Sequence, residues 1–166
     1  MNTSLLKKLL MATLIAGTYV TALAAMKVGD SLPDLTGFKL EGNVPDSLKG
    51  KIVILDFWAS WCGPCRESFP AMNDLQKKYG GQGLVILAVN EDEVASDMQD
   101  FLKENKATFT VLRDAKQNLV GAAGIQTMPS SLVIDGTGTV RFVHAGFYGD
   151  KTRKEYETQI ESLLKK

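Results

Sequence analysis

The sequence predicts an α/β fold, with one mixed central sheet and helices on both of its faces. Strand-like apolar segments alternate with helix-like segments through the middle of the chain, and two closely spaced strand-like segments follow near its end. The alternation indicates parallel strands joined by helices, and the closing pair indicates an antiparallel hairpin. With 166 residues, 45% of them hydrophobic, the chain can form one domain with a proper core, and a second domain would be cramped.

The start of the chain differs in composition from the rest. Lys7 and Lys8 precede an apolar run over residues 9–25 that ends in small side chains. This order is typical of a secretory signal peptide, and we expect cleavage at the end of the run. The alternatives are an uncleaved membrane anchor and an ordinary buried helix, but the run of 17 residues is short for a membrane span, which needs about 20.

We therefore assign residues 1–25 to a signal peptide and residues 26–166 to the mature domain. The mature protein would be periplasmic or otherwise exported, or held at the inner membrane if the leader is retained. The full chain carries 19 basic and 19 acidic residues, so its bulk charge attracts neither nucleic acid nor an anionic surface.

The first half of the domain contains the most regular patterns. Residues 27–50 hold several glycines and prolines between short apolar stretches, which predicts a lead-in with a small hairpin. Residues 51–58 are a continuous apolar run typical of a central strand buried on both faces, with Asp56 as its one acid. From Cys62 the pattern turns helical to about Tyr79, where two glycines end the helix.

The second half continues the alternation and ends in the hairpin and a last amphipathic helix. The Asp-Gly-Thr-Gly sequence at 135–138 provides the hairpin turn. In chain order, the expected elements are a strand at 84–89, a helix at 94–103, a strand at 109–112, a helix at 118–123, strands at 131–134 and 140–144, and a helix at 153–164.

The strongest chemical signal is Trp61-Cys62-Gly63-Pro64-Cys65, placed where the buried strand gives way to a helix. A cysteine at a helix N-terminus faces unpaired N–H groups and the positive end of the helix dipole, which favour the nucleophilic thiolate. Cys65, one turn into the helix, would be more buried and able to attack a mixed disulfide on Cys62. These are the only two cysteines, and in an oxidising compartment such a pair is expected to be disulfide-bonded or redox-active.

Two other uses of the cysteines fit less well. A structural zinc site takes four ligands, whereas the chain offers two cysteines and one histidine. A purely structural disulfide would gain little, because closing so small a loop stabilises by only about 2 kcal/mol on the chain-entropy model.

The segment 56–65, Asp-Phe-Trp-Ala-Ser-Trp-Cys-Gly-Pro-Cys, closely resembles the active-site segment of thioredoxins. Pro70 matches the proline within the helix of that family. Thr127-Met128-Pro129 resembles the loop whose proline is cis and faces the dithiol, and Gly146 resembles the glycine that lines the peptide groove.

The leader, Pro33-Asp34, the segment 48–51 and the longer middle section resemble the exported TlpA/ResA branch more than cytosolic thioredoxin. The resemblance covers the chain from about Val28 to its end. It implies a thioredoxin fold with an N-terminal extension and thiol-disulfide exchange without metal or organic cofactor.

The resemblance also supplies roles for two acids. The acid matching Asp56 serves the buried cysteine in thioredoxins, and its burial should raise its pKa so that it can take up a proton. A merely tolerated core acid is the alternative. The family's lysine near this acid falls at Ala88, which puts pairing with a cation in doubt. Glu93 resembles an acid near the dithiol in the ResA branch, and the alternative is a solvated acidic loop formed with its neighbours Glu91 and Asp92.

Substrate contacts are expected around the dithiol and along the cis-proline loop, whose backbone could pair with an extended peptide. We assign no role to His144, the only histidine. The candidate substrate-binding residues are Trp61, Gly63, Pro64, Thr127, Met128, Pro129 and Gly146.

The resulting hypothesis is a thiol-disulfide oxidoreductase acting through Cys62 and Cys65 on disulfides of exported proteins. Gly63-Pro64 matches the reducing members of the family, which favours a reductase over an oxidase or isomerase. By resemblance, a membrane-embedded dithiol would donate the electrons. We expect a monomer, and the client protein stays open.

Three other function classes share the fold or part of the motif. A peroxiredoxin needs a Pro-x-x-x-Thr-x-x-Cys segment, which is absent from the sequence. A copper-delivery protein of similar fold would need a wider cysteine spacing and a suitably placed histidine. A chaperone-like module that uses only the peptide groove remains an alternative.

Overall fold

The structure is a computed structural model and describes residues 25–165. The signal peptide expected at 1–25 therefore lies outside the described residues, except for Ala25. Within the described range, no helix combines the length and the apolar character that a membrane span requires.

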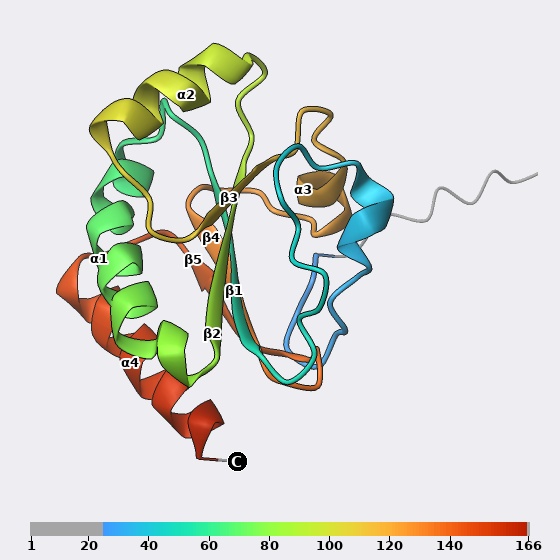
Figure 1. Cartoon of the computed structure of the whole chain (residues 1–166), viewed down its shortest axis with the longest axis vertical. Helices are drawn as coiled ribbons and strands as arrows, with labels where there is room; N and C mark the ends of the chain where they lie inside the picture. The colour runs from blue at the N-terminus through green and yellow to red at the C-terminus, as the bar shows by residue number, and fades with distance from the viewer. Residues whose placement is uncertain (1–24, 166) are drawn as a thin grey trace, which may run out of the picture.

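A five-stranded mixed sheet forms the centre of the domain, with strand order β3-β2-β1-β4-β5 (Figure 1). β1 runs parallel to β2, and β2 runs parallel to β3, whereas β4 and β5 pair antiparallel on the other side of β1. This arrangement confirms the mixed sheet and the closing hairpin. The strands are β1 (Ile52–Trp58), β2 (Leu84–Asn90), β3 (Thr110–Arg113), β4 (Ser130–Ile134) and β5 (Val140–Ala145).

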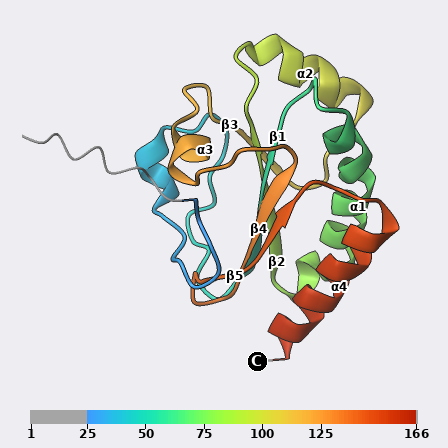
Figure 2. The same cartoon turned by 180° about the vertical axis from the view of Figure 1, so that it is seen from behind.

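Helices cover both faces of the sheet, as expected. α1 and α4 lie on one face, and α3 and the lead-in segment lie on the other, while α2 lies near the N-terminal end of α1 (Figures 1 and 2). The helices are α1 (Gly63–Tyr79), α2 (Ala95–Glu104), α3 (Asn118–Ala122) and α4 (Asp150–Leu164).

Alternation along the fully buried β1 divides its side chains between two cores. Ile54 and Trp58 pack with residues of α1, whereas Leu55 and Phe57 pack with α3 and the lead-in. Asp56 lies between Ile54 and Trp58 in this alternation and therefore belongs to the α1 face.

The prediction of a small hairpin in the lead-in was wrong. Residues 25–50 contain one short 3₁₀ helix, Leu35–Phe38, and isolated bridges from Ser31 to Thr139 and from Glu41 to Arg113. The five-residue α3 covers little of its face, and apolar lead-in residues pack against the core on that face of the sheet. These lead-in residues are Leu32, Leu35, Phe38, Leu40, Val44 and Leu48.

Candidate active site

The N-terminus of α1 presents Cys62 as its N-cap residue. Cys62 has extended backbone angles, and its Sγ accepts a hydrogen bond from the Cys65 N–H at 3.2 Å. Gly63 and Pro64 form the first turn, which holds no acidic side chain to offset the positive end of the helix dipole. A negative charge on the Cys62 sulfur would therefore be stabilised here.

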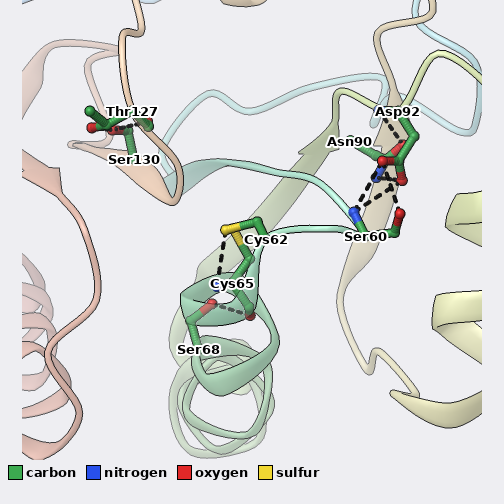
Figure 3. The surroundings of a disulfide bond; sticks show 8 residues. All are labelled: Ser60, Cys62, Cys65, Ser68, Asn90, Asp92, Thr127 and Ser130. Carbon is green, nitrogen blue, oxygen red and sulfur yellow. Dashed lines mark hydrogen bonds between the residues drawn. A yellow bond between two sulfur atoms is a disulfide. The ribbon is translucent and has the colours of Figure 1, made fainter.

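Cys62 and Cys65 form a disulfide bond at this helix end, with their Cα atoms 5.2 Å apart (Figure 3). The two residues differ in exposure. Cys62 keeps 6% of its surface accessible, whereas Cys65 keeps none. An incoming group can therefore reach the sulfur of Cys62 more readily than that of Cys65.

The loop before β4 approaches the dithiol from the other side of the site. Its Met128–Pro129 peptide bond is cis, which agrees with the expectation, and Met128 packs in the same cluster as both cysteines. The Thr127 carbonyl accepts a hydrogen bond from the Ser130 hydroxyl at 2.7 Å. The Gly146 N–H donates to the Pro129 carbonyl at 2.7 Å, so the loop and the end of β5 are fixed to one another.

The two tryptophans near the dithiol, Trp58 and Trp61, differ in their exposure. Trp61 is 72% exposed beside Cys62, whereas Trp58 is buried with its ring against Phe69 and Phe101. Next to Trp61 lies a cavity of about 330 Å³. Its lining residues are Ser60, Trp61, Arg66, Asp97, Asp100, Phe101 and Glu104.

Asp56 is a buried acid on the α1 face, only 2% exposed. Its Oδ1 has no hydrogen-bond partner within residues 25–165. Burial raises the pKa of Asp56 from 3.8 to about 8, because a carboxylate loses its hydration there. A carboxyl group with such a pKa can exchange a proton near neutral pH.

The three acids after β2 are arranged differently from the solvated loop that was the alternative to a role for Glu93. Glu93 is exposed, but Glu91 is 2% and Asp92 is 3% exposed. Burial, together with the charges of Asp114 and Asp92, raises the pKa of Glu91 to about 8. Glu91 follows β2 on the α3 face, since Leu87 and Val89 pack there. The solvated-loop alternative is therefore wrong for Glu91 and Asp92.

Asp92 holds the loop that leads to the dithiol (Figure 3). Its carboxylate accepts hydrogen bonds from the Ser60 N–H at 3.1 Å, the Ser60 hydroxyl at 3.0 Å and the Asn90 amide at 2.8 Å. Ser60 lies two residues before Cys62, so this carboxylate restrains the backbone of the active-site loop. Sequence reasoning missed this role because Ser60 and Asp92 are 32 positions apart.

Arg113 extends this network to the lead-in. Its Nη1 donates to the carbonyl oxygens of Asp92 and Glu93, and its guanidinium pairs with the Glu41 carboxylate at 2.9 Å. Arg113 is itself buried. The lead-in is thereby connected to the active-site loop through Arg113 and Asp92.

Residues 28–143 match the model of the AhpC/TSA family, which is thioredoxin-like. The chain belongs to this family. It is 34% identical to the thiol-disulfide oxidoreductase ResA of Bacillus thuringiensis over 143 residues, which cover 85% of this chain and 79% of the relative. It is 32% identical to ResA of Geobacillus thermodenitrificans over 151 residues, which cover 90% and 85% of the two chains.

Among solved structures, the domain is similar to a candidate thiol:disulfide interchange protein DsbE of Chlorobium tepidum. The TM-score is 0.77 at 40% identity, and the match covers 84% of this chain and 99% of the other. These relatives support thiol-disulfide oxidoreductase activity for this family member, and the thioredoxin fold is confirmed.

Ala88 lies beside Asp56 in the β1–β2 register, at the place expected for the lysine of thioredoxins. An alanine side chain cannot form an ion pair with the Asp56 carboxylate. Any stabilisation of the ionised form of Asp56 must therefore come from other neighbours. Within residues 25–165, no group of three or more potential ligands is arranged to hold a metal ion.

Proposed function

We propose that this protein is a disulfide reductase for exported proteins, with Cys62 as the nucleophile and Cys65 as the resolving cysteine. The observation that carries the proposal is the disulfide at the α1 N-terminus, in which Cys62 keeps 6% of its surface exposed and Cys65 keeps none. The relatives named thiol-disulfide oxidoreductase support the general activity.

The reaction starts from the dithiol form. The Cys62 thiolate attacks a client disulfide, a mixed disulfide forms, and one client sulfur leaves as a thiolate. The Cys65 thiol then gives its proton to the Asp56 carboxylate, and its sulfur attacks Cys62 Sγ. The second client sulfur leaves, so the client gains two electrons and the enzyme becomes the disulfide.

The client would lie across the dithiol between Trp61 and the cis-proline loop. In this proposal, the backbone at Thr127 and Met128 pairs with an extended client segment, and Pro129 and Gly146 line the groove. For Glu93 we propose recognition rather than proton transfer, because its side chain is exposed.

Gly63-Pro64 supports the reducing direction through its resemblance to reducing family members. A reductase in an oxidising compartment must be re-reduced, and we propose a membrane-embedded dithiol donor for that step. The leader at residues 1–25 would export the protein to the compartment in which both partners are found.

The reduction potential of the Cys62/Cys65 pair in the mature protein tests the direction. Equilibration against dithiothreitol and glutathione buffers, with mass readout, should give a value near or below about −250 mV for a reductase. A value near about −120 mV would reverse the direction to an oxidase.

Two variants test the assigned sulfurs. Cys65→Ser should accumulate a mixed disulfide with clients, because no thiol remains to resolve it. Cys62→Ser should form none, and full biological activity of that variant would favour a chaperone-like module over the enzyme.

A further inference from the structure

A row of side chains crosses the α1 face of the sheet at the level of Asp56. The strand registers pair Asp56 with Ala88 on β2 and with Ser131 on β4, and they pair Ser131 with His144 on β5. Residues paired in register point to the same face, and their Cβ atoms are about 5 Å apart. The buried acid therefore has a methyl group on one side and a hydroxyl group on the other.

Helix α4 adds a second hydroxyl group to this row. α4 lies across the same face as α1 (Figure 2), and it brings the Tyr156 hydroxyl into a hydrogen bond with the Ser131 hydroxyl. Ser131 and Tyr156 are 1% and 2% exposed. Burial and then the charge of Asp56 raise the pKa of Tyr156, which indicates that the phenol and the acid are neighbours.

Helix α1 and strand β5 also place side chains on the face of the sheet that holds Asp56. α1 brings Cys65 and Phe69 over this face, where they pack with Ala88. His144 lies beyond Tyr156, with its ring centroid 4.5 Å from the tyrosine ring and its Nε2 within 2.8 Å of the Gln159 amide oxygen. Besides the Cys65 thiol that would supply the proton, the strand register and α4 place the hydroxyl groups of Ser131 and Tyr156 at the level of Asp56.

We propose that Ser131 and Tyr156 are positioning residues that stabilise the ionised form of Asp56 through a chain of two hydroxyl groups. Tyr156 donates to Ser131, which frees the Ser131 hydrogen to turn toward the Asp56 carboxylate. When Asp56 takes the proton from Cys65, this hydrogen bond is released, and the Cys65 sulfur forms its bond to Cys62. The hydroxyl pair thus replaces the family's lysine in this chain.

This inference rests on the proposed role of Asp56 in the resolving step, and it has a measurable size. Burial alone, without a hydrogen bond to the carboxylate, raises the pKa of Asp56 to about 8. A hydrogen bond to the charged form lowers a carboxyl pKa, so its loss should raise the midpoint by about one pH unit. At a pH well below the midpoint, the ionised fraction would then fall about tenfold.

The experiment separates the two sulfur steps with dithiobis(nitrobenzoate) as the disulfide. Attack by Cys62 releases one coloured thiolate, and resolution by Cys65 releases the second, so stopped-flow absorbance gives two phases. The rate of the second phase is followed against pH. Ser131→Val is compared with Ser131→Thr, which has nearly the same volume but keeps a hydroxyl group, and Tyr156→Phe is compared with Tyr79→Phe.

Tyr79 is a suitable control, since its buried ring packs between the sheet and the same helices while its hydroxyl bonds to Glu161 instead. The proposal expects Ser131→Val to raise the midpoint of the second phase by about one unit and to slow this phase about tenfold at a pH well below the midpoint. Tyr156→Phe leaves the Ser131 hydroxyl in place, so it should raise the midpoint by less than Ser131→Val does. The rate of the first phase should be unchanged in all four variants. The rate and the pH midpoint of the second phase should be unchanged in Ser131→Thr and Tyr79→Phe.

Two different failures can be told apart. Unchanged midpoints in Ser131→Val and Tyr156→Phe, with a second phase that depends on pH only while Asp56 is present, would overturn the hydroxyl chain alone. An Asp56→Asn variant whose second phase keeps its rate and pH dependence would remove the role of Asp56 itself, and the inference with it.

Discussion

Replacing Asp56 with asparagine should stabilise the oxidised protein at neutral pH, and the gain should depend on pH. The pKa of Asp56 is raised from 3.8 in the unfolded chain to about 8 in the folded protein. Between these values the folded protein keeps a proton that the unfolded chain has lost. The free energy of unfolding therefore falls as the pH rises from about 4 to about 8.

The magnitude follows from the interval between pH 3.8 and the pH of the experiment. At pH 7 this interval is about three units, which at about 1.4 kcal/mol per unit gives a penalty of about 4 kcal/mol. At pH 4 the penalty is below about 1 kcal/mol. Asparagine removes the titration but adds a buried amide, whose cost of about 1–3 kcal/mol does not depend on pH.

The assay is urea unfolding of both oxidised proteins at pH 4 and pH 7. Between these two values, the advantage of Asp56→Asn should grow by about 3 kcal/mol. Glu91→Gln is the matched control, because burial and neighbouring charges also raise its pKa to about 8, but it lies on the opposite face of the sheet. It should show a similar pH-dependent gain without slowing the resolving step. Parallel pH profiles of unchanged and Asp56→Asn proteins would refute the reasoning.

Three further predictions concern the surroundings of the dithiol. Asp92→Ala should destabilise the protein by about 2–3 kcal/mol and speed hydrogen exchange at the Ser60 amide, because the carboxylate that accepts this N–H is lost. Equal exchange rates would contradict this. Gly146→Ala should lower the unfolding free energy by about 1 kcal/mol, since Gly146 has a φ of +87°, and thermal unfolding would detect the change. Trp61→Ala should leave stability within about 0.5 kcal/mol but weaken client exchange, because this side chain is 72% exposed; unchanged exchange with a peptide disulfide would argue against a client contact.

Local sequence signals predicted the framework of the site well. The continuous apolar run at 51–58 became the fully buried β1, Ile52–Trp58, and Cys62 became the N-cap of a helix that ends at Tyr79. Each of these features depends on neighbouring residues, such as β-branched side chains in the strand and two glycines after the helix. The sequence pattern therefore contained most of the information needed.

Long-range partners could not be predicted in the same way. The acids 91–93 look alike in the sequence, but Glu91 and Asp92 are buried whereas Glu93 is exposed. The partners that hold Asp92, Ser60 and Arg113, lie far from it in the sequence. The chain of hydroxyl groups beside Asp56 could not be predicted either, because it requires the register of two strands and the position of α4. The lead-in was misassigned for a related reason, since its apolar residues pack on a distant sheet face.

The connection of Glu41 through Arg113 to the active-site loop has a consequence for protein engineering. A shortened domain that starts at β1 would leave the guanidinium of Arg113 without its carboxylate and uncover an apolar sheet face. Near the start of the lead-in, the Met26 N–H donates a hydrogen bond to the Ala123 carbonyl. Affinity tags, fusion partners and surface tethers should therefore be attached ahead of Met26, so that the smallest working version of this enzyme retains the whole lead-in.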